Sequence, residues 1–276
     1  MHQQVPAPDA QQRAGAGKAA SATLVTSWGP HGWTQYARRF TKTFEDFWPS
    51  SVGLVCYVEE PVNVKRAEVR DLMAVHPCRD FLRRHKDNLA CQGKVQQPCW
   101  KSNERTAGRS YRTDAYKFCR KPFAIRDAAL RLGSGVLCWI DADVVTTHPV
   151  PENWLDDLLP ADADCAYLGR PASYSECGFL AFRLPGAMPL IERWTAYYDT
   201  DAVFSEREWH DSWLFDRARE RCPEVRCHNI TPDGRRHVWH MSPLTRFSDH
   251  CKGNWRKDLG HSPERFTQEA RRFRGA

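Results

Sequence analysis

The run GVLCWIDADVV at residues 135–145 decides the fold class of this chain. The uncharged stretch from Gly135 to Ile140 leads directly into Asp141 and Asp143, which are spaced i, i+2. An uninterrupted apolar run of this length is typical of a strand that is buried on both faces, as in the sheets of α/β proteins. Open α/β sheets bind ligands at the carboxyl ends of their strands, so we expect both carboxylates at a ligand-binding edge.

Asp141 and Asp143 also predict a site for a divalent cation. Hard oxygen donors suit Mg²⁺ or Mn²⁺, and proteins usually hold Mg²⁺ through one or two carboxylates together with substrate phosphates. A short Asp-x-Asp pattern is equally compatible with a turn or a helix cap after a strand. Other parts of the chain are needed to choose between these interpretations.

The length and composition fit one α/β domain. The chain has 276 residues, of which 41% are hydrophobic, and this is enough to bury a full core. We expect the domain to span residues 22–257, with an insertion or acceptor-side loops at 61–108. Residues 1–21 are predicted to be a disordered leader, and residues 258–276 a basic C-terminal tail.

Cysteine usage and hydropathy indicate a cytoplasmic protein. The eleven cysteines follow no regular spacing, and Cys138 lies inside the most apolar run, as reduced core thiols do. The sequence contains no apolar run of membrane-spanning length and no hydrophobic secretion signal. We therefore expect no membrane span, and a location in the cytoplasm, which would be the host cytoplasm if the chain is viral.

Positive charge is concentrated in two blocks. The net charge of the chain is +6, whereas residues 101–131 carry +6 and residues 217–276 carry +7, so the remainder carries −7. Such segregation favours an anionic partner: a nucleotide diphosphate, a phosphorylated acceptor or a nucleic-acid backbone. A solvated charged face is the alternative for either block.

The N-terminal part predicts a β-α-β unit. Residues 22–28 form an apolar strand, and residues 52–58 form a second. Between them, aromatic residues from Trp33 to Phe47 recur at helical spacing, which predicts one buried helix face rather than a ligand platform. This unit is the expected start of an α/β domain.

Three separated segments together resemble the GT-A class of nucleotide-sugar glycosyltransferases over most of residues 22–257. They are the end of the first strand at 26–28, the Asp-Ala-Asp at 141–143, and HCKGNWRK at 250–257. The last is similar to the His-x-x-Gly-x-x-Lys segment of glycogenin-like and lipopolysaccharide galactosyltransferase-like enzymes. The resemblance implies a GT-A (Rossmann-like) fold with a mixed, mostly parallel sheet flanked by helices, and a nucleotide-diphosphate sugar, in particular a UDP-sugar, as donor.

The resemblance also implies roles for individual residues. Asp141, Asp143 and His250 would hold Mn²⁺ or Mg²⁺ against the two donor phosphates. A departing diphosphate develops charge that such a cation, with Lys or Arg, would stabilise. Arg256 stands where the pattern has Lys, and Lys257 follows one position later, so either could contact the diphosphate. The full set expected to contact the donor is Thr26, Ser27, Trp28, Arg112, Lys117, Asp141, Lys252, Gly253, Arg256 and Lys257.

Two further acids are candidates for the catalytic end of the site. Glu176 occupies a loop and strand position that faces the donor sugar and acceptor in GT-A enzymes. Asp211 resembles the acid that opens a helix near the reacting carbon of the sugar. A general base must reach the acceptor hydroxyl, but an acid at a helix start is also a good cap, so both interpretations of Asp211 stay open.

These features predict a metal-dependent glycosyltransferase, either a hexosyl- or a pentosyltransferase, that acts on a hydroxyl acceptor. The acceptor could be 5-hydroxymethylcytosine in DNA, as for a viral DNA-modifying enzyme, because the basic tail could contact phosphates. A surface glycan or a small molecule is the alternative acceptor. Two other classes stay open: a non-catalytic nucleic-acid-binding domain, and a two-metal nuclease that uses Asp141, Asp143, Glu176 and Asp211.

Overall fold

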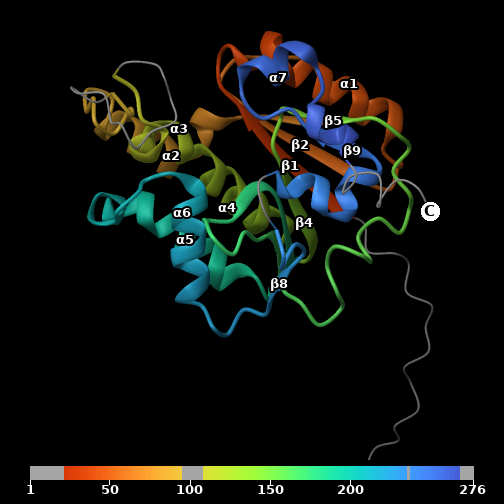
Figure 1. Ribbon diagram of the computed structural model, residues 1–276. Helices are drawn as coiled ribbons and strands as arrows, with labels where there is room; N and C mark the ends of the chain where they lie inside the picture. The colour runs from red at the N-terminus through yellow and green to blue at the C-terminus, as the bar shows by residue number, and fades with distance from the viewer. Residues whose placement is uncertain (1–21, 95–107, 235–236, 268–276) are drawn as a thin grey trace, which may run out of the picture.

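A computed structural model describes residues 22–94, 108–234 and 237–267. Its main sheet has seven strands in the order β3-β2-β1-β4-β7-β6-β8 (Figure 1). The strands of this sheet are β1 (Ala22–Trp28), β2 (Gly53–Val58), β3 (Glu68–Asp71), β4 (Gly135–Ile140), β6 (Cys165–Leu168), β7 (Glu176–Leu184) and β8 (Cys227–Asn229). The predicted leader at 1–21 and the end of the predicted tail, 268–276, lie outside the described residues.

The pairing of the strands confirms the predicted mixed, mostly parallel α/β sheet. Strands β3, β2, β1 and β4 run parallel, as do β6 and β8. Strand β7 is antiparallel to both of its neighbours, β4 and β6. Strand β4 therefore lies in the middle of the sheet, where residues 136–140 are all buried. The apolar run that leads into Asp141 is thus explained by burial on both faces.

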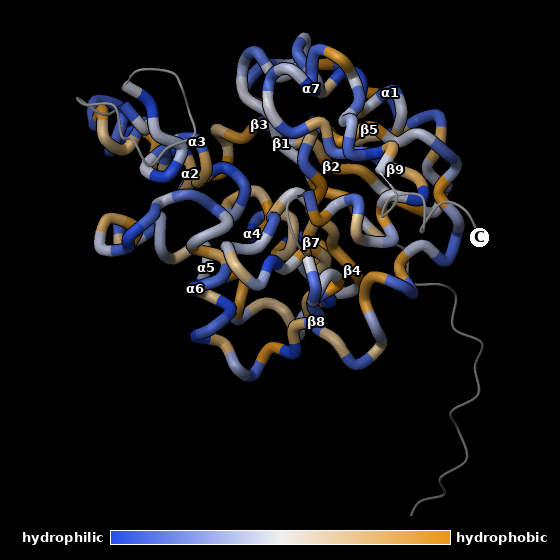
Figure 2. The backbone as a smooth tube through the Cα atoms, viewed as in Figure 1, coloured by the Kyte–Doolittle hydropathy of each residue, from blue (hydrophilic) through white to orange (hydrophobic). Residues whose placement is uncertain are grey.

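Helices cover both faces of the sheet (Figure 1). Alternate residues of a strand face opposite sides, so Leu24 packs with α1 while Val25 packs with α2 and α4. Figure 2 shows the hydrophobic residues concentrated in the central strands. The helices are α1 (Arg38–Phe47), preceded by a π-helical turn at Trp33–Ala37, α2 (His76–Arg84), α3 (Ala115–Phe118), α4 (Arg120–Leu132), α5 (Met188–Asp199), α6 (Asp211–Glu220) and α7 (Asn254–Leu259). Short 3₁₀ segments occur at Leu72–Ala74, Tyr111–Thr113, Ala202–Ser205, Val238–Met241, Pro243–Arg246 and Pro263–Phe266.

Part of the segment expected as an insertion or acceptor-side loops, 61–108, belongs to the main fold. Strand β3 extends the parallel sheet at its edge, and its register pairs Val55 with Glu68 and Val58 with Asp71. Helix α2 buries Phe81 in the core on one side of the sheet. The exposed edge of β3 accounts for its polar sequence, which does not show the apolar pattern of an inner strand.

A small second sheet joins the segment that follows β4 to the C-terminal segment that contains His250. Strand β5 (Val144–Thr146) pairs antiparallel with β9 (Ser248–His250), and Val144 lies opposite His250. This pairing brings the C-terminal segment to the carboxyl end of β4. Because β1 runs parallel to β4, the end of β1 at 27–28 lies at the same edge of the main sheet.

Ten cysteines lie within the described residues, and all ten are free thiols. Nine of them are buried, including Cys138 in β4. None of the helices described combines enough length with enough apolar character to cross a bilayer.

The packing of β7 yields a stability prediction. Phe182 is fully buried in the core, so Phe182→Ala should lower the free energy of unfolding by about 3–5 kcal/mol. Phe266 is 58% exposed, and Phe266→Ala should change the same quantity by less than about 1 kcal/mol. Urea denaturation of both variants measures the difference, and equal losses would contradict the assigned core.

Candidate functional site

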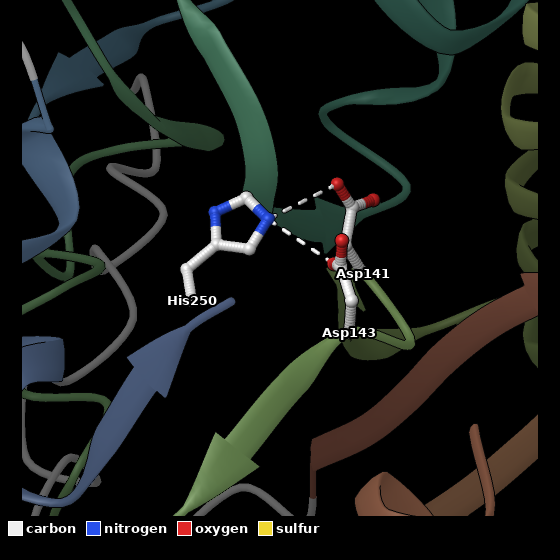
Figure 3. A group of neighbouring side chains, drawn as sticks. All are labelled: Asp141, Asp143 and His250. Atoms are coloured by element: carbon white, nitrogen blue, oxygen red, sulfur yellow. Dashed lines mark ion pairs between the residues drawn. The ribbon is translucent and has the colours of Figure 1, made fainter. Parts of the chain in front are cut away.

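Asp141, Asp143 and His250 come together at the carboxyl end of β4 (Figure 3). One potential ligand atom from each lies within 4.8 Å of the other two. The His250 Nε2 atom is 3.2 Å from Asp143 Oδ1 and 3.7 Å from Asp141 Oδ2. Figure 3 shows one ring nitrogen of His250 directed at both carboxylates. This arrangement can offer two carboxylate oxygens and an imidazole nitrogen to one cation.

Backbone hydrogen bonds hold the three residues in place. The Asp141 amide donates to the Gly178 carbonyl at 2.9 Å, which fixes the end of β4 against β7. The chain then turns, and the Val144 amide donates to the Asp141 carbonyl at 3.0 Å. The Cys251 amide donates to the Asp143 carbonyl at 3.1 Å, which ties the segment after β9 to the same turn.

Each carboxylate directs one oxygen at the imidazole and the other at a different partner. Asp141 Oδ1 accepts a hydrogen bond from Trp139 Nε1 at 2.7 Å and lies 3.0 Å from Lys121 Nζ. Asp143 Oδ2 lies 3.2 Å from Lys257 Nζ. Partners of this kind fix the orientation of metal-ligating carboxylates.

Neighbouring charges, more than burial, determine the protonation states of Asp143 and His250. Burial favours the neutral form of Asp143, but the nearby His250 and Lys257 outweigh it and hold the pKa of Asp143 below its ordinary value. Burial likewise lowers the pKa of His250, yet the surrounding carboxylates, with Asp143 contributing most, raise that pKa above its ordinary value. A metal ion binds the neutral imidazole, so metal binding at this site would release the proton from His250.

Lys121 connects Asp141 to Asp211, a role that the sequence did not reveal. Its Nζ lies 3.0 Å from Asp141 Oδ1 and 2.5 Å from Asp211 Oδ2, and it donates to the Cys177 carbonyl at 2.7 Å. Burial lowers the pKa of Lys121, but the two carboxylates outweigh that effect and raise the pKa, so the ammonium stays charged.

A signal for Lys121 exists in the sequence. Helix α4 buries residues 121, 124, 125, 128 and 129, which follow the i, i+3, i+4 pattern of one helix face. A lysine within such a face must find a charged partner, because an unpaired buried charge is strongly destabilising. Pro122 lies in the first turn of α4, where its missing N–H costs no helical hydrogen bond.

Asp211 is the first residue of α6, but the residue before it caps the helix. The His210 side chain accepts a hydrogen bond from the Trp213 amide at 3.4 Å. The Asp211 carboxylate instead pairs with Lys121, and its Oδ1 accepts from the Ser212 amide at 2.8 Å. Burial opposes ionisation, but Lys121 and His210 outweigh it and hold the pKa of Asp211 well below its ordinary range.

Glu176, the first residue of β7, is buried beside two cations. Its Oε2 lies 2.7 Å from Lys252 Nζ and 3.4 Å from an Arg170 guanidinium nitrogen. Burial raises the pKa of Glu176, but Lys252, then His250 and Arg170, outweigh burial and lower the pKa to about 2. Lys252 is thus paired with Glu176, whereas Lys257 reaches the Asp143 carboxylate.

Four other predicted donor contacts lie along the edge that carries the Asp-Asp-His group. Thr26 is fully buried, and its hydroxyl has no partner among the residues described. Ser27 is half-buried, and Trp28 is buried with its ring stacked on Trp33 at a centroid distance of 5.9 Å. Gly253, with φ +87°, precedes α7 and has open space where a side chain would begin.

The structure pairs three predicted donor contacts with other groups. Arg256 Nε donates to Glu264 at 3.2 Å, whereas the neighbouring Lys257 pairs with Asp143. Arg112 pairs with Glu208 at 3.2 Å. Lys117 is exposed, and its ammonium lies over the Phe118 ring, 5.2 Å from the ring centre.

Tyr36 lies near Asp141 and Asp143, although its spacing predicted a purely structural role. The Lys257 ammonium lies over the Tyr36 ring, 4.3 Å from its centre. Burial, followed by the negative charges of Asp143 and Asp141, raises the pKa of Tyr36 to about 12. Its phenol therefore stays protonated and can donate a hydrogen bond within the site.

Two solved structures are similar to this chain in fold. Mouse xyloside xylosyltransferase 1 in its apo form is 11% identical with a TM-score of 0.45, and the match covers 76% of this chain and 84% of that one. A glycosyltransferase involved in the glycosylation of the major capsid of PBCV-1 is 13% identical with a TM-score of 0.47, covering 86% and 98%. No model of a known family and no curated protein matches the sequence. At such low similarity, the function has to be inferred from the site itself.

A glycine beside His250 provides a test of whether this group binds a cation. A Cβ atom at Gly178 would lie 2.6 Å from His250 Cε1, and the imidazole packs against Trp239 at a centroid distance of 5.1 Å. Gly178→Ala should therefore displace the imidazole and weaken Mn²⁺ binding by about tenfold or more, as measured by calorimetry.

The matched control is Gly53→Ala, also a strand glycine. Its Cβ would meet Thr23 Oγ1 at 3.7 Å, which is an ordinary contact. This variant should bind Mn²⁺ like the unaltered protein. Equal Mn²⁺ affinities for the two variants would show that the imidazole is not a ligand.

Proposed function

We propose that this protein is a metal-dependent glycosyltransferase that moves a sugar from a nucleotide-diphosphate sugar to a hydroxyl acceptor. One observation carries the proposal: the Asp141, Asp143 and His250 group lies in direct contact with the ammonium of Lys257. A cation site beside a fixed positive charge suits the stabilisation of a departing diphosphate. Its position at the carboxyl end of a central strand is the usual ligand site of an open α/β sheet.

The donor set fits Mn²⁺ or Mg²⁺. Two carboxylate oxygens are hard ligands of the kind that both ions prefer, and an imidazole nitrogen is acceptable to Mn²⁺. Three protein ligands leave coordination positions for phosphate oxygens of a substrate. When bound, the cation would supply the positive charge that offsets the negative charge developing on the leaving diphosphate.

The cations around the site have distinct proposed roles. Lys257 would bind a donor phosphate, because its ammonium is already held 3.2 Å from Asp143 and has three donors to share. Ser27, Trp28 and the open backbone at Gly253 would contact the remainder of the nucleotide. Arg256 would support this segment through its pairing with Glu264 rather than bind the donor.

The two acids at the catalytic end are better suited to charge stabilisation than to proton removal. A general base works best when its pKa lies near the operating pH, whereas the pKa of Glu176 is lowered to about 2. Asp211 is similarly held ionised by Lys121. We therefore assign Asp211 to the donor sugar and Glu176 to the acceptor side, where each would stabilise positive charge that develops on the sugar during transfer.

The two-metal nuclease is not supported by the arrangement of the acids. Glu176 and Asp211 are each paired with a lysine. Across the parts of the chain that the structure describes, one group of at least three metal-ligating side chains is found. A second cation would therefore have to displace an ammonium from a buried carboxylate.

One candidate acceptor to be tested is 5-hydroxymethylcytosine in DNA. It rests on the basic character of the C-terminal sequence, part of which lies outside the described residues. The test is hydrolysis of a panel of nucleotide sugars with Mn²⁺ or EDTA, with hydroxymethylated and plain DNA. Metal-dependent release of nucleoside diphosphate that only the modified DNA stimulates would support this acceptor, and the absence of any stimulation would exclude it.

Asp143 is the residue whose loss should most directly remove the activity. Asp143→Asn keeps the size of the side chain but removes its charge, so Mn²⁺-dependent donor turnover should fall at least about a hundredfold. The control is Asp80→Asn, because Asp80 is 50% exposed and pairs with Arg79 on the surface. Release of nucleoside diphosphate measures both variants. Turnover by Asp143→Asn at the rate of the control would contradict the metal role.

The neighbours Lys257 and Arg256 provide a matched pair for donor binding. Lys257→Gln should raise the KM for the donor about tenfold or more, because it removes a phosphate contact. Arg256→Gln should leave this KM nearly unchanged and instead lower the free energy of unfolding by about 1–3 kcal/mol, because it breaks the partly buried pair with Glu264. Steady-state kinetics and urea denaturation separate the two effects, and a reversed pattern would place the phosphate contact at Arg256.

A further inference from the structure

A cavity of about 570 Å³ lies next to the start of β7, where Ser175 is one of its lining residues. Its walls come from the end of β6 with the loop that follows it, from residues 207–220, and from the 3₁₀ turn at 111–113. Tyr167, Tyr174 and Trp213 supply aromatic surface. Five arginines line the cavity: Arg112, Arg170, Arg207, Arg217 and Arg219.

Positive charge exceeds negative charge in this cavity. Three carboxylates lie among its lining residues, against the five guanidinium groups. Each carboxylate already has an arginine partner, and Asp216 also accepts hydrogen bonds from the amide and hydroxyl of Ser175. The pairs are Arg112–Glu208 at 3.2 Å, Arg219–Asp216 at 3.3 Å and Arg217–Glu220 at 2.5 Å.

The hydrogen-bonding capacity of these arginines is not fully used. The Nε atoms of Arg112, Arg217 and Arg219 are buried and have no partner within the described residues. An unpaired buried donor carries a free-energy cost, which a ligand that drew the guanidinium groups towards it would remove. The planar fork of a guanidinium matches the oxygens of a phosphate group.

Both basic blocks of the sequence contribute to this one cavity. Arg112 belongs to the block at 101–131, and Arg217 and Arg219 belong to the block at 217–276. The charge segregation predicted an anionic partner, and the fold brings cations from both blocks to the same place.

We propose that this cavity binds the phosphate group of a small phosphorylated acceptor, such as a sugar phosphate, that carries the hydroxyl to be glycosylated. This inference rests on the proposed function. Arg170 lines the cavity and also lies 3.4 Å from Glu176, so an acceptor bound here would reach the catalytic end of the site. The volume is in the usual range for small-molecule pockets, which favours a small acceptor over a nucleic-acid duplex.

The reaction leaves the acceptor phosphate unchanged. The acceptor hydroxyl oxygen forms a bond to the anomeric carbon of the donor sugar, while the bond between that carbon and the diphosphate oxygen breaks. The nucleoside diphosphate leaves with the bonding electron pair, and the hydroxyl proton passes to the departing diphosphate or to water. The arginines only hold the acceptor in position.

The test is direct binding of glucose 6-phosphate and of glucose to the full chain by calorimetry, without metal or donor. The phosphorylated sugar should bind at least tenfold more tightly than glucose. Arg217→Gln and, separately, Arg207→Gln should each weaken the binding of glucose 6-phosphate at least fivefold. Arg207 is 72% exposed, so its substitution leaves the fold intact.

Arg84→Gln is the matched control for Arg217→Gln. Arg217 pairs with Glu220 and lies over the Trp213 ring at 5.0 Å, and Arg84 pairs with Asp201 and lies over the Phe81 ring at 5.8 Å. The two side chains are 33% and 40% exposed, but Arg84 is not a lining residue of the cavity. The Arg84→Gln variant should bind glucose 6-phosphate like the unaltered protein.

Three results would overturn the inference: equal binding of the two sugars, unchanged binding by both cavity variants, or equal losses in Arg84→Gln. If the cavity arginines were required for binding a hydroxymethylated DNA duplex and glucose 6-phosphate did not bind, the cavity would be assigned to nucleic acid, which would also overturn the inference. Arginine-dependent binding of glucose 6-phosphate without turnover of any donor would instead support the cavity while contradicting the proposed glycosyltransferase activity.

Discussion

Buried carboxylates at one edge of the sheet have to be balanced by positive charge, and the site is built around this requirement. Desolvation of a carboxylate favours its neutral form unless a cation lies close by. Here Glu176 and Asp211 remain ionised chiefly because each lies beside a lysine, and Asp143 remains ionised because it lies beside His250 and a lysine. The pairs are Asp143–Lys257 at 3.2 Å, Asp211–Lys121 at 2.5 Å and Glu176–Lys252 at 2.7 Å.

These lysines come from three segments, so the charge balance depends on the tertiary fold. Lys121 comes from α4, Lys252 follows β9, and Lys257 comes from α7. The pairing of β5 with β9 is the step that brings the C-terminal two lysines and His250 to the end of β4. If the proposed cation binds here, its affinity and the local stability would be linked, because the same contacts that assemble the candidate ligands also neutralise the acids around them.

The sequence could predict those features of the fold and the site that a local residue pattern encodes, but not those that depend on tertiary contacts. The strand that leads into Asp141 was predicted correctly, because burial on both faces leaves an uninterrupted apolar run. The choice between Arg256 and Lys257 stayed open, because neighbours on a helix point about 100° apart and only the placement of α7 decides which one faces Asp143. Helical periodicity can place Lys121 on an inward-facing helix surface, but it does not identify the partners of Lys121 or Tyr36, which come from distant segments.

In the proposed glycosyl transfer, the ionised state of Glu176 and Asp211 would constrain how the acceptor hydroxyl loses its proton. A carboxylate whose pKa is held this low gains little by accepting a proton, and protonation would also break its pairing with a buried lysine. The departing diphosphate, in contrast, becomes more basic as its bond to the sugar breaks. We therefore infer that the leaving group is the better proton acceptor, and that the two acids act through their fixed negative charge.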